Sequence, residues 1–488
     1  MNELFYKNEV AVIKTIDHYD VEVPFDPPAL YPEFSGTKNS KMSGFNPIYD
    51  SVRKLFIALE LDKERIDSGK WNPLSGLIVP GNKVFIKPNL VRENNGIGQD
   101  MNSMVTHASV IRPIIDYVHL ALEGRGEIVV GDAPVPEANF QIITNKNHLQ
   151  PTIGYLTNLY RSEKFDIKLI DMRFARGSEE EFHEFDHLGI EIDLKQDSFL
   201  DLFSDKELEN LTYLYEDNSF MAKVHNRLAN KYRIAREFLD ADVFINVPKL
   251  KTHYKAGVTL SLKNLVGLAT NKSYIPHLRK GPPSRNGDET PDYGLMEKIG
   301  GKMKRHKNDL KRKFLYLCSN LAGDKAGFIR RIETKYRLVK PPKGCWQGND
   351  TIWRVALDLN RIMLFADKNG VMGNGLQRRI FNVIDGIVGG EKNGPLCCLK
   401  KPAGILVGGH NPYAVDLTAT RLMGFDHEKI PLMRNARKEQ WLINAGPVVV
   451  SSNIPDWNTK DLARDYHKMM PDLDFIEPDN WHIKIQRS

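Results

Sequence analysis

The stretch that decides the fold comprises residues 241–269 and reads ADVFINVPKLKTHYKAGVTLSLKNLVGLA. Its residues 243–247 are mostly β-branched or aromatic, which predicts a buried strand. Pro248 has no backbone N–H to donate, so we expect the strand to end before it. The polar residues that follow predict a loop at the end of that strand.

This loop carries a concentration of positive charge. Four lysines and one histidine fall within fifteen residues, with no acidic residue among them: Lys249, Lys251, His253, Lys255 and Lys263. Such groups repel one another unless an anion lies between them, so a ligand with a phosphate or carboxylate group would stabilise the cluster. The alternative is that the lysines point into water. The position of the cluster favours a site, because open α/β sheets bind ligands just beyond their strand ends.

The composition is that of an ordinary globular chain. Of the 488 residues, 41% are hydrophobic and 27% are charged, and this length allows about three domains. No apolar run of about 18 residues occurs, and the N-terminal residues lack the apolar core of a signal peptide. We therefore expect a cytoplasmic protein with no transmembrane segment. The four cysteines form no C-x-x-C pair, so we expect no iron–sulfur cluster.

Positive charge is also concentrated in region 300–340, which has thirteen Lys and Arg against three Asp and Glu. We expect this region to be helical, within a basic helical insertion at 295–345. A patch of this kind can bind nucleic acid or an anionic membrane surface. The alternative is a solvated helix face.

Alternating strands and helices predict the architecture. Strand 83–86, helix 106–124 and strand 127–130 follow one another, which is typical of a parallel βαβ crossover. Further elements are predicted as helix 229–239 and strands 243–247, 381–384 and 404–407. We predict an α/β fold with a largely parallel sheet and helices on both faces, plus a mixed α+β insertion.

The chain is expected to divide around this core. The predicted parts are an N-terminal extension (1–80), a first part of the α/β core (81–150), an insertion or lid subdomain (151–228), a second part of the core (229–430) that includes the basic helical insertion, and a C-terminal tail (431–488). The insertion is assigned from short strand patterns and turn-rich connections.

Each predicted core strand is followed by residues able to bind a ligand. These residues are Lys87 and Asn89, then Asp132, then Lys249, Lys251 and His253, then Asp385 and Glu391, then His410 and Asn411. Parallel strands would bring them to one edge of the sheet. His107 would join them from the N-terminus of its helix, where the helix dipole lowers the pKa of a histidine.

A pocket with lysines and carboxylates suits two kinds of chemistry. One is acid–base catalysis at a carbon next to a carboxylate, and the other is phosphate binding with a divalent metal on Asp132, Asp385 and Glu391. The carboxylates also have structural alternatives. Asp132 can cap a turn, Asp385 can form one with Gly386, and Asp416 can accept hydrogen bonds from the first N–H groups of its own helix.

Five blocks of sequence resemble, in order, the landmarks of the family called domain of unknown function 362. The blocks are KPNLV (87–91), GDAP (131–134), PKLKTHYKAGVTLSLKNLVG (248–267), DGIVGGEKNGPL (385–396) and AVDLTATRLMG (414–424). The resemblance spans about residues 80–430. The family has no generally assigned activity. Some members carry a ferredoxin-like cluster domain, for which this chain lacks the cysteine pattern.

One block is also similar to a segment of the nickel-pincer lactate racemases. His253 is followed ten residues later by Lys263. The resemblance implies acid–base catalysis by His253, a cofactor tether at Lys263, a second catalytic histidine at His107 and a nickel-pincer nucleotide as cofactor. Residues 259–262 replace the small residues of that family. His277, in a long polar loop at 271–292 expected to fold over a ligand, is offset from the family's nickel-binding histidine.

We therefore predict a cytoplasmic enzyme that binds a phosphate- or carboxylate-bearing small molecule or cofactor, with histidine-based proton transfer such as epimerisation. The predicted catalytic residues are His253, His107 and Lys263. The predicted binding residues are Lys87, Asn89, Lys249, Lys251, Thr259 and Asn264. The alternative is a partner protein that binds nucleic acid or an anionic surface through region 300–340.

Overall fold

A computed structural model describes most of the chain. The described residues are 5–19, 22–35, 41–176, 183–184, 189–213, 218–292, 343–467 and 472–485. The basic region 300–340, and with it nearly all of the predicted helical insertion 295–345, lies outside them.

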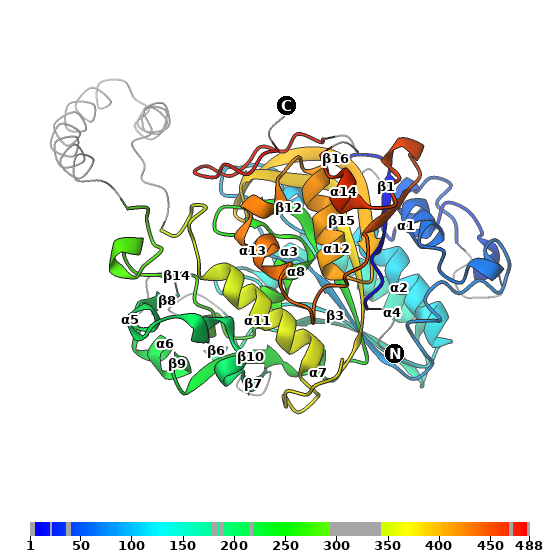
Figure 1. Cartoon of the computed structure of the whole chain (residues 1–488). Helices are drawn as coiled ribbons and strands as arrows, with labels where there is room; N and C mark the ends of the chain where they lie inside the picture. The colour runs from blue at the N-terminus through cyan, green and yellow to red at the C-terminus, as the bar shows by residue number, and fades with distance from the viewer. Residues whose placement is uncertain are drawn as a thin grey trace, which may run out of the picture.

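A ten-stranded, mostly parallel sheet runs through the molecule (Figure 1). Its main path, in spatial order, is β17 (Val449–Ser452), β1 (Glu9–Lys14), β16 (Cys397–Gly409), β15 (Arg379–Asn393), β11 (Val243–Val247), β2 (Lys83–Pro88), β3 (Gly126–Asp132) and β4 (Phe165–Asp171). The pairs from β15 to β4 are parallel, whereas β16 runs antiparallel to both of its neighbours. The predicted α/β fold is confirmed.

The two faces of the sheet support separate hydrophobic cores, because side chains alternate along each strand. In β2, Val84 and Ile86 pack into one core and Phe85 into the other. The first core contains α1 (Pro47–Ala58), α2 (Ala108–Leu122) and α4 (Leu149–Tyr160). The second contains α8 (Leu260–Asn264), α11 (Ile352–Phe365), α12 (Pro412–Leu422) and α13 (Pro431–Ala436). Helices therefore cover both faces, as predicted.

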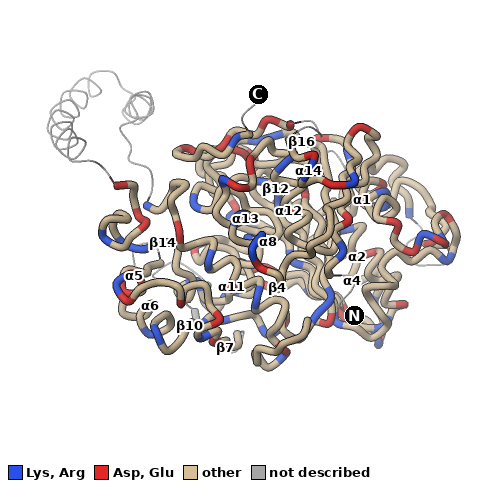
Figure 2. The backbone as a smooth tube through the Cα atoms, viewed as in Figure 1, with Lys and Arg blue, Asp and Glu red and all other residues tan. Residues whose placement is uncertain are grey.

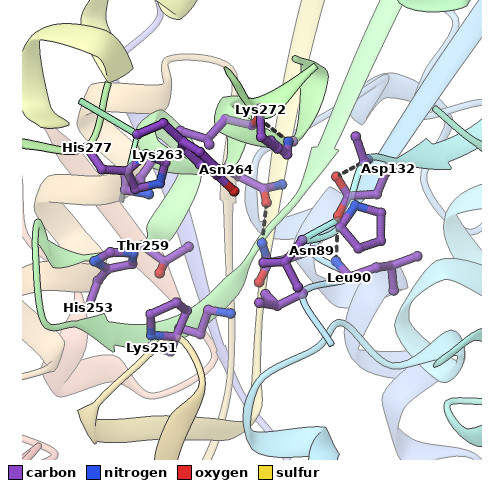
Figure 3. Close-up of a pocket in the computed structure, with 18 residues that line it drawn as sticks. Asn89, Leu90, Asp132, Lys251, His253, Thr259, Lys263, Asn264, Lys272 and His277 are labelled. Atoms are coloured by element: carbon purple, nitrogen blue, oxygen red, sulfur yellow. Dashed lines mark hydrogen bonds between the residues drawn. The ribbon is translucent and has the colours of Figure 1, made fainter. Parts of the chain in front are cut away.

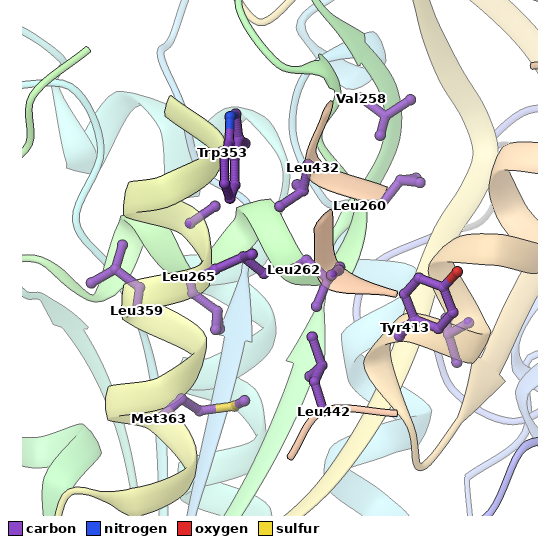
Figure 4. Packing of buried hydrophobic residues seen from close by; sticks show 14 of the residues in the cluster. Val258, Leu260, Leu262, Leu265, Trp353, Leu359, Met363, Tyr413, Leu432 and Leu442 are labelled. Atoms are coloured by element: carbon purple, nitrogen blue, oxygen red, sulfur yellow. The ribbon is translucent and has the colours of Figure 1, made fainter. Parts of the chain in front are cut away.

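The five-residue helix α8 is fixed by the second core (Figure 4). Its Leu260 and Leu262 are fully buried, among Leu359 of α11, Tyr413 of α12 and Leu432 of α13. Burying one leucine side chain contributes about 2 kcal/mol. An isolated helix this short is not stable in water, so packing rather than propensity holds α8.

β11 and β12 (Lys249–His253) differ from the predicted strand and loop. The first strand ends at Val247 as expected, but a second strand begins directly after Pro248 and pairs with β15. Proline still accepts through its carbonyl, and the Asp385 N–H donates to Pro248 O at 2.9 Å. Pairing therefore continues past the proline, and β12 turns back through β13 (Gly257–Val258).

The predicted helix 229–239 is mostly a strand. β10 spans Ala229–Ala235, and only a single turn, α7 (Arg236–Leu239), is helical. The strand buries alternate residues at Asn230, Tyr232 and Ile234, a period of two that overrides helix propensity. β10 pairs with β7 (Gly189–Asp193) and β9 (His225–Asn226) in a small antiparallel sheet, which forms part of the mixed α+β portion beside the main sheet.

Residues assigned to the flanking parts also enter the main sheet. β1, from the predicted N-terminal extension, lies between β16 and β17, and β17 comes from the predicted C-terminal tail. At the other edge, β4 comes from the start of the predicted insertion. The sheet is therefore assembled from segments far apart in the sequence.

Because β16 is antiparallel to β15, the two candidate residues that follow β16, His410 and Asn411, lie away from the other predicted site residues. Gly409, at the end of β16, pairs with Asn382 near the start of β15. His410 accordingly contacts the carbonyl oxygen of Ile380 through Nδ1 at 3.2 Å, and Asn411 caps the N-terminus of α12. Both lie at the opposite edge from Asp132, so the expectation that all five strand ends meet is wrong for this one.

Replacing Leu262 with Ala should lower the free energy of unfolding by about 3 kcal/mol, because it leaves a cavity beneath α8. Leu228→Ala is the matched control, since Leu228 is 84% exposed and its truncation should change stability by less than about 0.5 kcal/mol. Chemical denaturation followed by circular dichroism measures both. Equal effects of the two substitutions would contradict the anchoring of α8 by this core.

Candidate functional site

A cavity of about 120 Å³ lies at the carboxyl ends of β2 and β3, next to β12 and α8 (Figure 3). Its polar lining includes Asn89, Asp132, Lys251, His253, Thr259, Lys263, Asn264, Lys272 and His277. Seven of these nine residues are predicted site residues. Lys272 and His277 are additions, contributed by the long polar loop that was expected to fold over a ligand.

The carboxylate at the cavity is already neutralised. Lys87 Nζ lies 2.6 Å from Asp132 Oδ1, and both side chains are buried. Asp132 also accepts from the N–H groups of Leu90 and Ala133, at 2.6 and 2.9 Å. Lys87 therefore holds Asp132 from beneath the lining and does not itself line the cavity.

Gly267 covers this ion pair closely. A Cβ at that position would lie 2.0 Å from Asp132 Oδ1 and 2.4 Å from Lys87 Nζ. The Ala133 N–H donates to Gly267 O at 3.0 Å, which ties the loop after β3 to the segment after α8. The absence of a side chain at Gly267 thus allows the wall of the cavity to close over the pair.

A second polar cluster lies at the N-terminus of α2, where none of its members lines the cavity. Asp385 accepts from Lys249 Nζ at 3.0 Å, from Tyr19 OH at 2.6 Å and from the His107 N–H at 3.0 Å. The Tyr19 and His107 rings stack with their centroids 4.0 Å apart. Three predicted site residues, Lys249, His107 and Asp385, therefore form a buried structural cluster.

The predicted lowering of the His107 pKa is present, but its cause differs. Burial is the largest contribution to the lowered pKa, followed by the charge of Lys249. His107 Nδ1 lies 2.8 Å from Ser109 Oγ, so this nitrogen already has a hydrogen-bond partner within the protein. The structure therefore does not bring His107 to His253 as a second catalytic histidine.

The three predicted metal ligands do not converge. Asp132 is paired with Lys87, and Asp385 is paired with Lys249. Glu391 accepts from the Ile476 N–H at 2.9 Å, while Pro395 of the same segment reaches the cavity instead. Among the residues that the structure describes, no group of three His, Cys, Asp or Glu side chains is placed to hold a metal ion.

Lysines dominate the charge of the cavity. Lys251 Nζ donates to Met104 O at 2.6 Å, and Lys272 Nζ donates to Val266 O and Ala269 O at 2.8 and 3.0 Å. Burial lowers the pKa of each from 10.5 to about 7. Figure 2 shows basic and acidic residues interspersed along the described chain. The excess of lysines at the cavity therefore differs from the mixed charge distribution of the rest of the described chain.

Lys263 is the unpaired member of this group. It is 7% exposed, and its ammonium has no hydrogen-bond or ion-pair acceptor within the described part of the chain. Burial, with a smaller contribution from Lys255, lowers its pKa to about 7. Because a buried charge without a partner is costly, an anion in the cavity would stabilise its protonated form.

Two further polar atoms at the cavity lack partners. Asn89 donates through Nδ2 to Asn264 Oδ1 at 2.8 Å, but its own Oδ1 is unsatisfied. Thr259 Oγ1 is likewise buried without a hydrogen bond to any described residue. Native proteins satisfy most buried polar atoms, so these two are candidates for contacts with a ligand. Asn89, Thr259, Asn264 and Lys251 retain their predicted position at the site.

Both histidines of the cavity are held through Nδ1. His253 Nδ1 accepts from the N–H groups of Lys255 and Ala256, at 3.1 and 3.2 Å. His277 Nδ1 lies 2.8 Å from Ile275 O. Burial is the main cause of a lowered pKa in both, and the pKa of His277 falls to about 3. Each ring is therefore neutral near pH 7.

Asp416 positions α8 rather than its own helix. Its carboxylate accepts from the N–H groups of Ser261 and Leu262, at 2.7 and 2.9 Å. Leu260, just before them, has a φ of +47°, a conformation costly for a non-glycine residue. The buried carboxylate, whose pKa is raised to about 7 by desolvation, holds this turn and so directs Lys263 toward the cavity.

Comparison with known proteins assigns a family to the segment that carries most of this site. Residues 194–421 match the family model described as "Domain of unknown function (DUF362)". This segment is a DUF362 domain. It contains β12, α8, His277 and Asp416, whereas Asn89 and Asp132 lie before it. The cavity is thus formed by the DUF362 domain together with the preceding β2 and β3.

Part of the chain is also similar to a curated protein. The chain is 25% identical over 203 residues to a thylakoid-associated protein of Synechocystis sp.. The match covers 41% of this chain and 44% of the relative, so the chain spans less than half the length of that protein. No solved structure matches the chain. Within the described ranges, none of the helices combines the length and apolar character needed to cross a membrane.

The cavity does not fit the nickel-pincer nucleotide implied by the weaker resemblance. Its volume of about 120 Å³ is well below the roughly 300–1,000 Å³ of typical cofactor pockets. The small residues expected before Lys263 are replaced, and Leu260 and Leu262 fill the core beneath. His107 also lies in the separate cluster. The side chains of the cavity instead suit a ligand of a few non-hydrogen atoms.

Replacing Asp385 with Asn should lower the free energy of unfolding by about 3 kcal/mol, because Lys249 is then left buried without its counter-charge. Asp456→Asn, at an exposed position, is the matched control and should be nearly neutral. Urea denaturation of both variants measures the difference. A loss below about 1 kcal/mol for Asp385→Asn would contradict a structural role for this cluster.

Proposed function

We propose that this chain is a cytoplasmic enzyme that binds a small carboxylate- or phosphate-bearing molecule in the cavity and transfers a proton by histidine chemistry, as in an epimerisation. The observation that carries the proposal is the unpaired ammonium of Lys263 in a cavity whose carboxylate is neutralised by Lys87. An anion is the ligand whose charge complements such a cavity.

Charge and desolvation together support an anionic ligand. Lys251, Lys263 and Lys272 are all buried at the cavity, and burial is the main cause of their lowered pKa values. An anion placed among them would favour the protonated form of each lysine. Interactions with a charged group are stronger in a desolvated site than at the surface. The binding energy would therefore come from the attraction between the anion and the lysines, which become protonated when it binds.

The size of the cavity limits the size of the ligand, and the position of His253 indicates the type of reaction. The cavity of about 120 Å³ is smaller than the roughly 300–1,000 Å³ of typical ligand pockets, which suits a small organic acid. His253 lines it beside Lys251 and Thr259 (Figure 3). A histidine next to a bound carboxylate can exchange protons with the carbon or oxygen beside it. This combination favours proton transfer over simple anion storage.

The second hypothesis concerns residues outside the described part of the chain. Binding of nucleic acid or an anionic surface by region 300–340 stays a prediction from the sequence. The thylakoid association named for the relative belongs to that protein.

Replacing Lys263 with Met should weaken binding of oxalate at least tenfold, because it removes about 1.4 kcal/mol or more of charge-assisted interaction. Isothermal titration calorimetry at neutral pH measures the dissociation constants. Lys460→Met, at an exposed lysine, is the matched control and should bind as the unaltered chain does. Equal affinity of the Lys263 and Lys460 variants would exclude Lys263 from the anion site.

Oxalate binding should also weaken as pH rises through about 7. The pKa of Lys263 is about 7 without ligand, and an anion binds its protonated form, so binding takes up a proton above that pH. We expect affinity at least tenfold lower at about pH 9 than at about pH 6. Oxalate remains fully ionised over this range. The Lys263→Met variant should show a smaller change, and an affinity that increases with pH would contradict this assignment.

A further inference from the structure

The two histidines of the cavity have opposite hydrogen-bond environments. His253 comes from β12 and His277 from the loop after α8, and both line the same space as Lys263 (Figure 3). Each ring uses Nδ1 for a bond within the protein, but the partner is a donor in one case and an acceptor in the other. Because a neutral imidazole carries one proton, these partners fix where it lies.

His253 is held as the tautomer with its proton on Nε2. Two backbone N–H groups, of Lys255 and Ala256, point at Nδ1. A backbone N–H can only donate, so Nδ1 must provide a lone pair. The proton of the neutral ring then lies on Nε2, and no hydrogen bond within the described residues uses that atom.

His277 is held as the other tautomer. Its Nδ1 lies 2.8 Å from the carbonyl oxygen of Ile275. A carbonyl oxygen can only accept, so Nδ1 carries the proton and Nε2 keeps a lone pair. The ring of Tyr213 packs against it edge-on, with centroids 5.1 Å apart, and fixes its orientation.

Building on the proposed function, we propose that His277 Nε2 is the proton acceptor of the cavity and His253 Nε2–H is its proton donor. The lysines of the cavity, Lys251, Lys263 and Lys272, bind the carboxylate of the substrate. The substrate class that matches this arrangement is a small 2-oxo acid, which has a carboxylate, a carbonyl oxygen and an acidic C–H group on the neighbouring carbon.

The reaction is an enolisation. His277 Nε2 takes the proton from the carbon next to the carbonyl, the C–H electron pair forms the carbon–carbon double bond, and the carbonyl π electrons move to oxygen. His253 Nε2–H donates its proton to that oxygen. Return of a proton to the carbon and of the hydroxyl proton to His253 regenerates the ketone, so no oxidant or other reactant is needed.

The bound acid would also strengthen its own base. Burial is the largest cause of the low pKa of His277, and the charge of Lys255 is the next, with Lys263 and Lys272 contributing less. Lys263 and Lys272 line the cavity, so a carboxylate bound beside them offsets their repulsion of a proton on His277. Proton abstraction is therefore favoured when the cavity is occupied. Without ligand, the ring stays uncharged beside the lysines.

Nitrogen NMR on the full chain with ¹⁵N-labelled histidine tests the proton positions directly. His253→Gln and His277→Gln variants assign the two rings among the 14 histidines. His410, whose Nδ1 contacts Ile380 O, is an internal reference for the Nδ1–H tautomer. We expect Nε2–H at His253 and Nδ1–H at His277 near pH 7. The reverse tautomer at either ring overturns the proton assignment, whether or not the chain is active.

Deuterium exchange tests the chemistry. With 2-oxobutyrate in D₂O, the unaltered chain should accelerate loss of the C3 protons in ¹H NMR spectra. His277→Asn should slow that exchange at least about 100-fold, as expected for loss of a general base. His482→Asn, at a side chain that is 90% exposed, should exchange at the unaltered rate. An unchanged rate in His277→Asn overturns the role of His277.

The remaining outcomes separate this inference from the proposed function. If the unaltered chain binds oxalate but exchanges no C3 protons of 2-oxobutyrate, the oxo-acid class is wrong and anion binding stands. If it does not bind oxalate, the anion-binding function itself is wrong.

Discussion

The buried ion pair between Lys87 and Asp132 determines the character of the whole site. The pair joins the ends of β2 and β3 and lies against Gly267, which follows α8. The carboxylate of Asp132 also accepts hydrogen bonds from backbone N–H groups in the loops after both strands. Breaking such a pair by removing one partner costs about 3–5 kcal/mol. Because the pair neutralises Asp132, the charge that remains at the cavity is that of its lysines. A site for an anion follows from this one interaction.

The position of Lys263 shows how the fold presents that charge. Two elements restrain α8: apolar packing of Leu260 and Leu262 on one side, and the carboxylate of Asp416 at its first turn. The helix is too short to form by itself, so both restraints come from distant segments. They leave the opposite side of α8, with Lys263 and Asn264, facing the cavity. The strained turn at Leu260 is the local cost of this arrangement.

The sequence predicts the elements of this protein better than their pairing. The apolar runs and helix periods locate β2, α2, β3 and β11, because these signals are local. The direction of β16 is set by contacts with β1 and β15, which no local pattern records, and this is why His410 and Asn411 were placed at the wrong edge. The sequence shows the lysine cluster. It does not show that Lys249 forms an ion pair with Asp385 and Lys87 with Asp132, because these pairs depend on three-dimensional packing. The position of His277 in a long polar loop indicated that it could reach a ligand. The number of residues between His253 and His277 does not show that the two rings line the same cavity.

The central claim is that the cavity holds an anion on Lys263. Anomalous diffraction from crystals of the full chain soaked in selenate would test it most directly, because selenium marks the bound anion. We predict an anomalous peak inside the cavity, within hydrogen-bond distance of Lys263 Nζ and beside Lys251 and Lys272. Selenate bound only at surface lysines, with the cavity free of it, would contradict the account.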